Sequence, residues 1–426
     1  MQPRIRYDRT IVHQHHEQTV HVMLDLEAPP APPLERAPID VVVVLDRSGS
    51  MSGDPLAAVK RATADVIAHA GADDRIGVVT FDDSVELLLP LAHHEPRSAA
   101  KTIGRIHSGG STNMSGGWLK ALEMLVADGR ADAVKRIVIL TDGHANAGIT
   151  EPDQLVGMVR GGHRQGITTS CIGFDDGYDE RLLAALADAG LGNDYWCDGP
   201  DQAHAVFQQE FGGLAAVVAQ NLSVEVRPGT VVAAAAVLNE FPITDVPGGA
   251  LVTLGDAVGG ERRRVVAKFN LRPLNNEGEV EVATMVIKWV STIGDIELHT
   301  ATVPVRLTVG ADGAVDNGAD PEVNEEVLRL EVARNRKAAR DAAERGDYDG
   351  AAEYLRCSID MLHDSAEGAS VVDELRTDID RLSTRMWSAS DAKRHFSRSR
   401  SAMKGRRVDF TDIPGADDSG SDGSAV

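Results

Sequence analysis

Side chains with the chemistry of a hard metal site follow a short apolar run early in the chain. The valine run 41–44 leads through Leu45 into Asp46, Ser48 and Ser50, which alternate with single spacer residues. One carboxylate and two hydroxyls are hard oxygen donors, which Mg²⁺ or Mn²⁺ prefers, and no Cys or His in this stretch favours zinc. Three side chains cannot complete an octahedral site, so we expect other segments to supply further ligands.

Two later segments offer such ligands. Thr112 lies in a glycine-rich loop ahead of a helix-like segment, and Asp142 follows the run 137–141 and precedes Gly143. Apolar runs that end in a polar turn are typical of strands buried on both faces of a parallel sheet. The carboxyl ends of parallel strands share one edge of the sheet, where ligands bind. We therefore expect these side chains to lie on the same edge as Asp46.

Strand and helix signals alternate between residues 39 and 220, as in a mostly parallel sheet wrapped by helices. The expected strands are 41–45, 75–81, 85–89, 137–141, 168–174 and 194–197. The expected helices are 55–70, 96–106, 114–126, 153–164, 180–189 and 202–218. The strand 85–89 follows a tight turn at Asp82 and Asp83, which predicts an antiparallel hairpin at the sheet edge.

The pattern DxSxS, then a threonine loop, then TDG resembles the metal-ion-dependent adhesion site (MIDAS) of the von Willebrand factor A (VWA) domain. The resemblance extends over about 39–220 and includes all five liganding positions, which are Asp46, Ser48, Ser50, Thr112 and Asp142. It implies an α/β fold of the Rossmann-like, doubly wound type. It also implies Mg²⁺ (or Mn²⁺) with the hydroxyls as direct ligands and an open position that takes an Asp or Glu carboxylate from a protein partner.

Simpler roles stay open for these residues taken singly. Ser50 or Ser52 could cap the helix 55–70, Thr112 could cap the following helix, and Asp142 could form a turn. The hypothesis of a metal site depends on all five residues acting together.

Three neighbours of the predicted ligands have secondary roles in this hypothesis. Arg47 could form an ion pair with a nearby carboxylate or with the partner. Asn113 could donate or accept a hydrogen bond within the site, and His144 could shape the partner surface.

The periodicity changes from helical to alternating at residue 221. Six segments beyond it alternate like strands and are separated by Gly and Pro clusters, as in an antiparallel β-sandwich: 223–227, 231–233, 251–254, 264–269, 279–290 and 297–309. Segments 10–13 and 19–26 also indicate strands, and two strands are not stable alone. We expect them to complete the sandwich, which makes the VWA-like unit an insertion within it. The proline-rich 28–33 is expected to be a stiff linker between them.

Helical composition returns near the C-terminus, at 321–345, 349–365 and 370–388. Part of it resembles a tetratricopeptide-type hairpin, but such arrays need about three repeats, so a plain helical hairpin or bundle is favoured. Segment 393–407 has seven basic and no acidic residues, which indicates a flexible linker or an anion-binding segment, and the Gly, Ser and Asp of 413–426 predict disorder.

These boundaries divide the chain into six parts. They are N-terminal sandwich strands (1–38), a VWA domain (39–220), a β-sandwich (221–311), a linker (312–320), a helical domain (321–392) and a basic then acidic disordered tail (393–426).

Composition limits the classes of partner. The net charge of −22 disfavours nucleic acid, and the apolar runs are too short to cross a membrane. The first nine residues lead into no signal peptide, and three cysteines without paired spacing argue against a disulfide framework. We therefore expect a cytoplasmic protein that contacts neither nucleic acid nor membrane.

Motifs for catalysis are missing from the sequence. It has no Walker-type, HExxH or GxGxxG motif, and the stretch 49–53 has Met51 where the hydrolase GxSxG motif needs Ser. The leading hypothesis is therefore a divalent-metal-dependent protein–protein interaction module that is not an enzyme. Two alternatives stay open: an adaptor subunit of an AAA-type ATPase or chelatase complex, and a metal-dependent hydrolase. The resemblance also implies that the helix 202–218 can shift when the metal acquires a carboxylate ligand. We therefore predict that partner binding alters the contacts of the sandwich that follows this helix.

Overall fold

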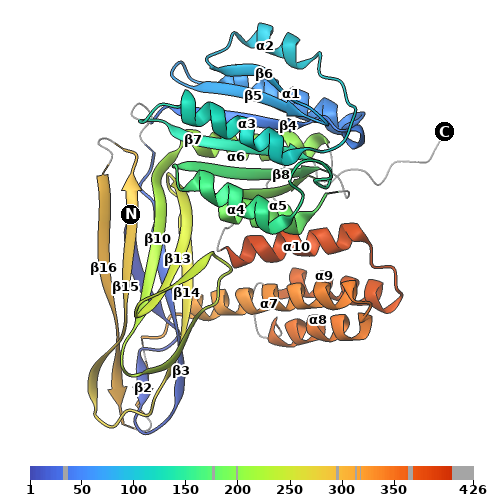
Figure 1. Ribbon diagram of the computed structural model, residues 1–426. Coiled ribbons are helices and arrows are strands. Elements are labelled where there is room, and N and C mark those ends of the chain that lie inside the picture. Colours follow the sequence, from blue (N-terminus) through green and yellow to red (C-terminus); the bar gives the residue numbers. More distant parts are fainter. Residues whose placement is uncertain are drawn as a thin grey trace, which may run out of the picture.

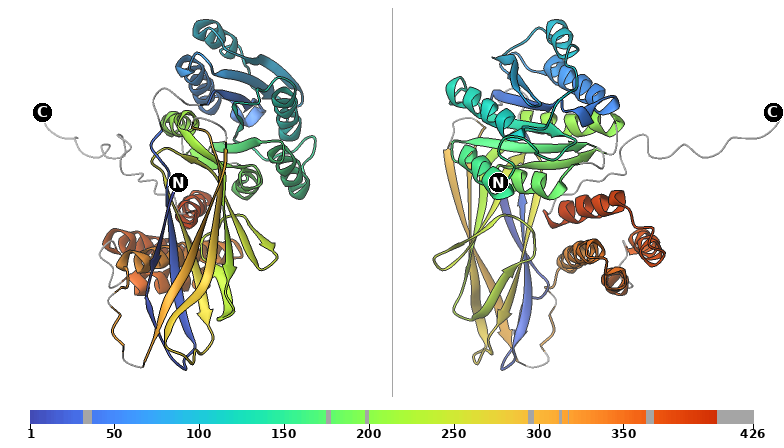
Figure 2. Two further views of the ribbon diagram at one scale, coloured as in Figure 1. Left: turned by 90° about the vertical axis from the view of Figure 1, so that its left-hand side faces the viewer. Right: turned by 45° about the vertical axis from the view of Figure 1, so that its right-hand side comes forward.

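The computed structural model describes residues 1–31, 37–174, 178–197, 200–293, 297–311, 314–316, 318–362 and 368–404. Three bodies are visible: a helix-wrapped sheet, a long β-sandwich below it and a helical bundle beside both (Figures 1 and 2). The predicted proline-rich linker 28–33 is described only as far as Ala31.

A six-stranded sheet organises the first body, in the order β6-β5-β4-β7-β8-β9. Its strands are β4 (Ile39–Asp46), β5 (Arg75–Phe81), β6 (Val85–Ala92), β7 (Val134–Thr141), β8 (Ile167–Phe174) and β9 (Leu191–Cys197). All pairs are parallel except β5 with β6, which forms the predicted antiparallel edge hairpin.

Helices cover both faces of this sheet because its central strands are apolar on both faces. In β4, Val41, Val43 and Leu45 join one buried cluster, whereas Val42 and Val44 join the other. The first cluster also takes residues from α1 (Asp54–His69), α2 (Pro96–Ile103) and α6 (Pro200–Ala215). The second takes residues from α3 (Met114–Ala127), α4 (Pro152–His163) and α5 (Glu180–Ala189). The predicted doubly wound α/β fold is confirmed.

The β-sandwich is formed by strands that precede the α/β unit in the sequence and strands that follow it. One of its sheets has the order β1-β3-β14-β11 and the other β12-β13-β10-β15-β16-β2. The strands are β1 (Gln2–Tyr7), β2 (Ile11–His13), β3 (Gln18–Glu27), β10 (Val217–Pro228), β11 (Val232–Val237), β12 (Ile243–Val246), β13 (Gly249–Val258), β14 (Arg262–Leu271), β15 (Gly278–Ser291) and β16 (Glu297–Gly310). Because β3 pairs along its whole length with β14, the α/β unit is an insertion in the sandwich, as predicted.

The junction between the two bodies corrects one predicted boundary. The helix expected at 202–218 ends at Ala215, and β10 begins at Val217. Val217 pairs with Val258 of β13, and Ala219 pairs with Ser291 of β15, so the backbone is extended there. Val218 and Ala219 are buried in the sandwich core. Helix α6 therefore leads into the sandwich after a single intervening residue, Ala216.

Four helices form the third body: α7 (Pro321–Glu344), α8 (Tyr348–Leu362), α9 (Gly368–Ser383) and α10 (Ala389–Met403). Helix α7 packs against both α8 and α10, as in the bundle that the sequence favoured. The turn between α7 and α8 occurs at Gly346, whose φ of 81° suits glycine.

Helix α10 contradicts the predicted disordered tail for 393–403. Ser388 and Asp391 form a capping box at the N-terminus of the helix. Basic side chains farther along the helix bind the α/β domain. Lys393 Nζ donates to the carbonyl of Tyr178 (2.7 Å), and Arg400 binds Asp188 and Asp194 (2.7 Å each). The basic residues are thus ordered by carboxylates distant in sequence. The rest of the predicted tail, 405–426, lies outside the described residues.

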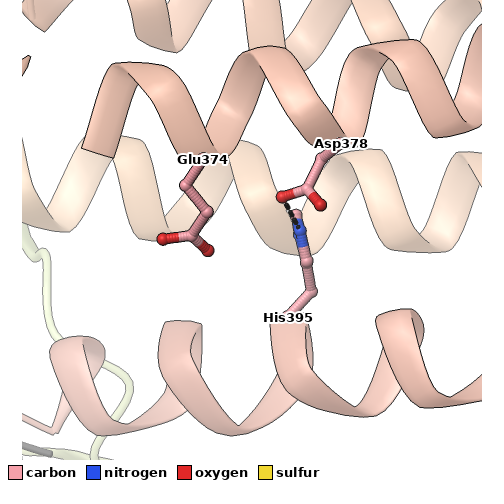
Figure 3. A group of neighbouring side chains, drawn as sticks. All are labelled: Glu374, Asp378 and His395. Carbon is pink, nitrogen blue, oxygen red and sulfur yellow. Dashed lines mark hydrogen bonds and ion pairs between the residues drawn. The ribbon is translucent and has the colours of Figure 1, made fainter. Parts of the chain in front are cut away.

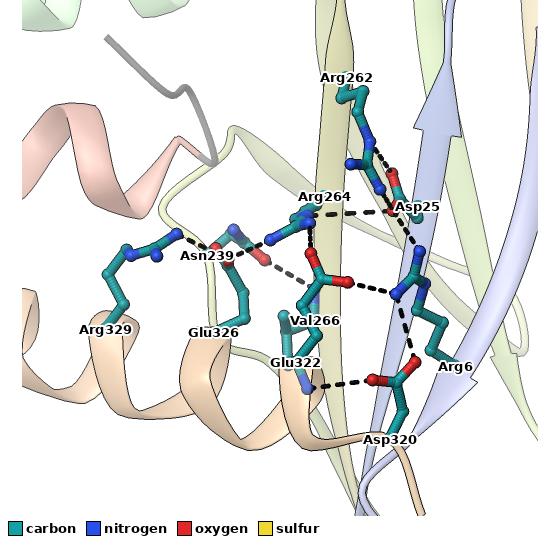
Figure 4. A network of polar contacts seen from close by, with 10 residues as sticks. All are labelled: Arg6, Asp25, Asn239, Arg262, Arg264, Val266, Asp320, Glu322, Glu326 and Arg329. Carbon is teal, nitrogen blue, oxygen red and sulfur yellow. Dashed lines mark hydrogen bonds and ion pairs between the residues drawn. The ribbon is translucent and has the colours of Figure 1, made fainter. Parts of the chain in front are cut away.

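Arginines on the sandwich hold the first turns of α7 (Figure 4). Arg264 of β14 donates to Glu326 (2.9 Å), and Arg6 of β1 donates to Asp320 (3.2 Å). Glu322 accepts from both arginines. The helical bundle is therefore attached to the sandwich through α7 and to the α/β domain through α10.

Candidate metal centre

The structure brings the five predicted ligands to the carboxyl edge of the sheet. Asp46 is the last residue of β4, and Asp142 directly follows β7. Thr112 precedes α3, while Ser48 and Ser50 lie in the loop after β4, where a short 3-10 helix spans Gly49–Met51. Asp46, Ser48, Thr112 and Asp142 are buried, and Ser50 is exposed. One predicted ligand position therefore faces solvent.

Contacts within the group show how closely these side chains approach one another. The Ser48 backbone N–H donates to Asp46 Oδ1 (2.7 Å), and Ser50 Oγ donates to Asp142 Oδ1 (2.7 Å). The two serine hydroxyl oxygens are 3.2 Å apart. A Cβ on Gly143 would lie 3.4 Å from Thr112 Oγ1 and 3.6 Å from Ser50 Oγ, which places the threonine hydroxyl beside the others.

The simpler roles proposed for the hydroxyls do not hold. Helix α1 begins after Gly53 with no side-chain cap, so neither Ser50 nor Ser52 caps it. Helix α3 is capped by Asn113, whose Oδ1 accepts from the Gly116 N–H (3.0 Å), and not by Thr112. The hydroxyls of Ser50 and Thr112 are therefore not engaged as helix caps.

Asp46 is a buried carboxyl group with a raised pKa. Burial raises its pKa to about 6, and the charge of Asp142 adds to the rise, whereas hydrogen bonds from Thr141 and Ser48 oppose it. Thr141 Oγ1 donates to Asp46 Oδ2 (2.5 Å). Within the described part of the chain, no Lys, Arg or His forms an ion pair with Asp46. A divalent cation would supply the missing positive charge, and the all-oxygen donor set fits Mg²⁺ or Mn²⁺.

Arg47 does not supply this charge. Its Nε donates to Asp82 (2.9 Å) and its Nη1 to Glu86 (2.8 Å), so the guanidinium is turned to the β5–β6 hairpin. Of the other two predicted neighbours, Asn113 is the helix cap described above. His144 is 67% exposed beside the Asp142 loop, with Nδ1 4.0 Å from Asp179.

Two side chains that hold the site in place, Thr141 and Asn146, are not predicted by the sequence patterns. Thr141 belongs to the quoted TDG motif, but its role became visible only from its bond to Asp46. Asn146 Oδ1 accepts from the Thr112 backbone N–H (2.7 Å), a contact between residues 34 positions apart. Neither contact has a local sequence signal.

A second group of possible ligands lies in the helical bundle: Glu374, Asp378 and His395 (Figure 3). Their ligand atoms lie within 4.8 Å of one another. However, Arg398 and Arg336 both form ion pairs with Glu374, and His395 Nε2 donates to Asp378 (2.7 Å). The two guanidinium groups oppose a cation here, and the cluster joins α9 to α10.

A cavity of about 460 Å³ lies where the three bodies meet. Its lining includes Arg136, Arg263, Glu210, Asp256 and Glu326. Arg136 is bound to Glu210 and Asp256 (2.8 Å each), and Arg263 binds the carbonyl of Asp256 (2.9 Å). These charges are largely satisfied by one another, so the cavity is a less suitable ligand site than the sheet edge.

Comparison with known proteins supports the assignment of the α/β unit. The family model of the von Willebrand factor type A domain matches residues 40–220. An uncharacterized protein of Synechocystis sp., sll0103, is 28% identical over 331 residues, which are 75% of this chain and 78% of that protein. The E3 ubiquitin-protein ligase WAV3 of Arabidopsis thaliana is 30% identical over 253 residues, 56% of this chain. This match spans only 32% of the ligase.

Two solved structures share the arrangement of nearly the whole chain. A von Willebrand factor type A protein from Catenulispora acidiphila has a TM-score of 0.72 at 18% identity, covering 95% of this chain and 97% of its own. The ArnB paralog VWA2 from Sulfolobus acidocaldarius has a TM-score of 0.60 at 16% identity, covering 95% and 98%. At this identity the likeness shows the fold. Among the described residues, no helix is long and apolar enough to cross a membrane.

Proposed function

Because residues 40–220 of this chain form a von Willebrand factor type A domain, we propose that the protein is a divalent-metal-dependent protein–protein interaction module. Mg²⁺, or Mn²⁺, binds at the carboxyl edge of the sheet through Ser48, Ser50 and Thr112, with Asp46 and Asp142 directly or through water. The bound ion acts as a Lewis acid toward an Asp or Glu carboxylate of the partner. Domains of this family typically mediate protein interactions, which supports the proposal.

The observation that carries the proposal is the uncompensated Asp46 beside three hydroxyls that cap no helix. A buried carboxylate without a cationic partner is costly, and a cation offsets that cost. Ser50 is exposed, which leaves the ion accessible to a partner from the solvent side.

We also propose a cytoplasmic location. Cys171, Cys197 and Cys357 are all free, which is compatible with the reducing conditions of the cytoplasm.

An affinity pull-down from cell extract tests this function. Wild-type protein should capture a partner in Mg²⁺ and release it in EDTA, and Ser50→Ala should capture much less than wild type in Mg²⁺. Partners that bind equally with and without EDTA would contradict the proposal. Recovery of an AAA-type ATPase would instead favour an adaptor subunit of an ATPase or chelatase complex. Metal-dependent ester or phosphate hydrolysis that Ser50→Ala abolishes would make the protein a hydrolase.

Metal removal is expected to make stability depend on pH between about 4 and 6. The pKa of Asp46 is raised from 3.8 to about 6, so in this window the folded state holds a proton that the unfolded chain has released. The contribution of Asp46 to stability therefore falls as pH rises through the window, by on the order of 2–3 kcal/mol at about 1.4 kcal/mol per pKa unit, and it is measured as the difference between wild type and Asp46→Asn. Mg²⁺ at pH 7 should restore it.

Thermal unfolding from pH 4 to pH 8, in chelator and in saturating Mg²⁺, measures this effect. Asp46→Asn is the control, because it has no carboxyl to titrate and should show neither the loss nor the restoration. A stabilisation by Mg²⁺ that is equal at pH 4.5 and pH 7 would show that Asp46 does not bind the ion in its charged form.

A further inference from the structure

The loop after Asp142 is fastened to the loop that carries Thr112. Asn146 Oδ1 accepts from the Thr112 N–H (2.7 Å), while the N–H groups of Asn146 and Ala147 donate to the Thr112 carbonyl (3.2 and 3.3 Å). Both polar groups of the Thr112 backbone are thus held by residues 146–147. Of these three bonds, only the one to Oδ1 depends on a side chain.

A second contact joins the same loops farther along. Ser115, in the first turn of α3, accepts from the Ile149 N–H (2.8 Å) and donates to Asn113 Oδ1 (3.2 Å). Gly148 lies against this turn: a Cβ there would be 2.1 Å from Asn113 Oδ1, and its φ is 71°. The end of the loop is therefore set independently of Asn146. The Asn146 side chain adds a constraint on the backbone N–H of Thr112.

We propose that Asn146 is a positioning residue for the metal centre, which acts by fixing the Thr112 hydroxyl relative to Asp142. This inference rests on the proposed function. Asp142 directly follows β7, whereas Thr112 lies in a loop with no strand to hold it. Asn146 couples the two, because it is four residues after Asp142 and bonds the Thr112 backbone. Asn146 itself is exposed, so it is accessible to substitution without a change in the core.

The expected effect is on metal affinity. Loss of an outer hydrogen bond that orients a ligand typically weakens metal binding 10–100-fold. We expect Asn146→Ala to weaken Mn²⁺ binding by about tenfold or more, because Thr112 is then held only through the two bonds to its carbonyl and its hydroxyl must be ordered further when the ion binds. Asn146→Asp keeps an acceptor oxygen at the same place and should keep at least the wild-type affinity.

The test is calorimetric titration with Mn²⁺ on the full chain, using wild type, Asn146→Ala, Asn146→Asp, Thr112→Val and the double variant Asn146→Ala with Thr112→Val. If Asn146 acts through the Thr112 hydroxyl, its replacement should cost nothing further once that hydroxyl is gone. Thr150→Ala, at an exposed position in the same loop, is the matched control and should bind like wild type. Metal-free melting curves identify any variant that is simply less folded.

The outcomes separate this inference from the proposed function. Wild-type affinity in Asn146→Ala, or additive losses in the double variant, would overturn the positioning role and leave the metal site intact. No Mn²⁺ binding by wild type would overturn both. Weaker binding in Asn146→Ala with recovery in Asn146→Asp and no additional loss in the double variant is the expected result.

Discussion

Asp46→Asn is expected to weaken Mg²⁺ binding strongly while making the metal-free protein more stable at pH 7. The substitution removes a buried negative charge that no described Lys, Arg or His pairs with, so the folded state loses a desolvation cost. It also removes one of the two carboxylates that would attract the proposed ion. Titration calorimetry should show a fall in affinity of about a hundredfold or more, because a ligand lost within the site costs at least as much as an outer contact.

Asp40 provides the matched control for this substitution. It is in the same strand and equally buried, but it accepts from Arg75 (2.9 Å) and Arg130 (2.8 Å) at the opposite end of β4. Although burial opposes it, these two arginines lower the pKa of Asp40. Asp40→Asn should therefore destabilise the protein and leave Mg²⁺ affinity unchanged. Metal-free stabilities that change in the same direction for both variants would show that Asp46 carries no special electrostatic load.

The opposite behaviour of these two aspartates shows what the sequence could indicate and what it could not. Asp46 was singled out because it ends an apolar run and starts the DxSxS pattern, and strand ends lie at the ligand-binding edge. The structure places all five predicted side chains there; their role as ligands stays a prediction. Asp40 gave no comparable signal, because its arginines are 35 and 90 residues away.

Long-range charge pairing is also why the C-terminal segment was misjudged. A run of basic residues without acidic neighbours is locally typical of a solvated linker. Arg400 instead binds Asp188 and Asp194, and Lys404 binds the same two carboxylates, more than 200 residues earlier in the chain. Periodicity predicted the buried elements well, since the core determines it. It missed the edge strands β1 and β12, whose side chains are mostly exposed or half-buried.

Glu210→Ala is expected to destabilise the protein strongly, because Glu210 joins helix α6 to the sheet and, through Arg136, to the sandwich. Its fully buried carboxylate accepts from Arg136 (2.8 Å), Ser170 (2.6 Å), Asn193 (2.7 Å) and Tyr195 (3.0 Å). Arg136 also donates to Asp256 of β13 (2.8 Å). Removal of one partner of a buried ion pair costs about 3–5 kcal/mol, since the remaining charge is left in a low dielectric.

Urea unfolding measures this loss, and Glu123→Ala is the control, since the exposed Glu123 pairs with Lys120 across one turn of α3 and should cost at most a few tenths of a kcal/mol. A Glu210→Ala change of less than about 1 kcal/mol would show that the network is not holding α6.

The same network connects α6 to β13, because Arg136 binds both Glu210 and Asp256, so a movement of α6 can reach β13 through it. If partner binding alters hydrogen exchange in the sandwich, as we predict from the sequence, the change should include β13 in wild type and be lost from it in Glu210→Ala.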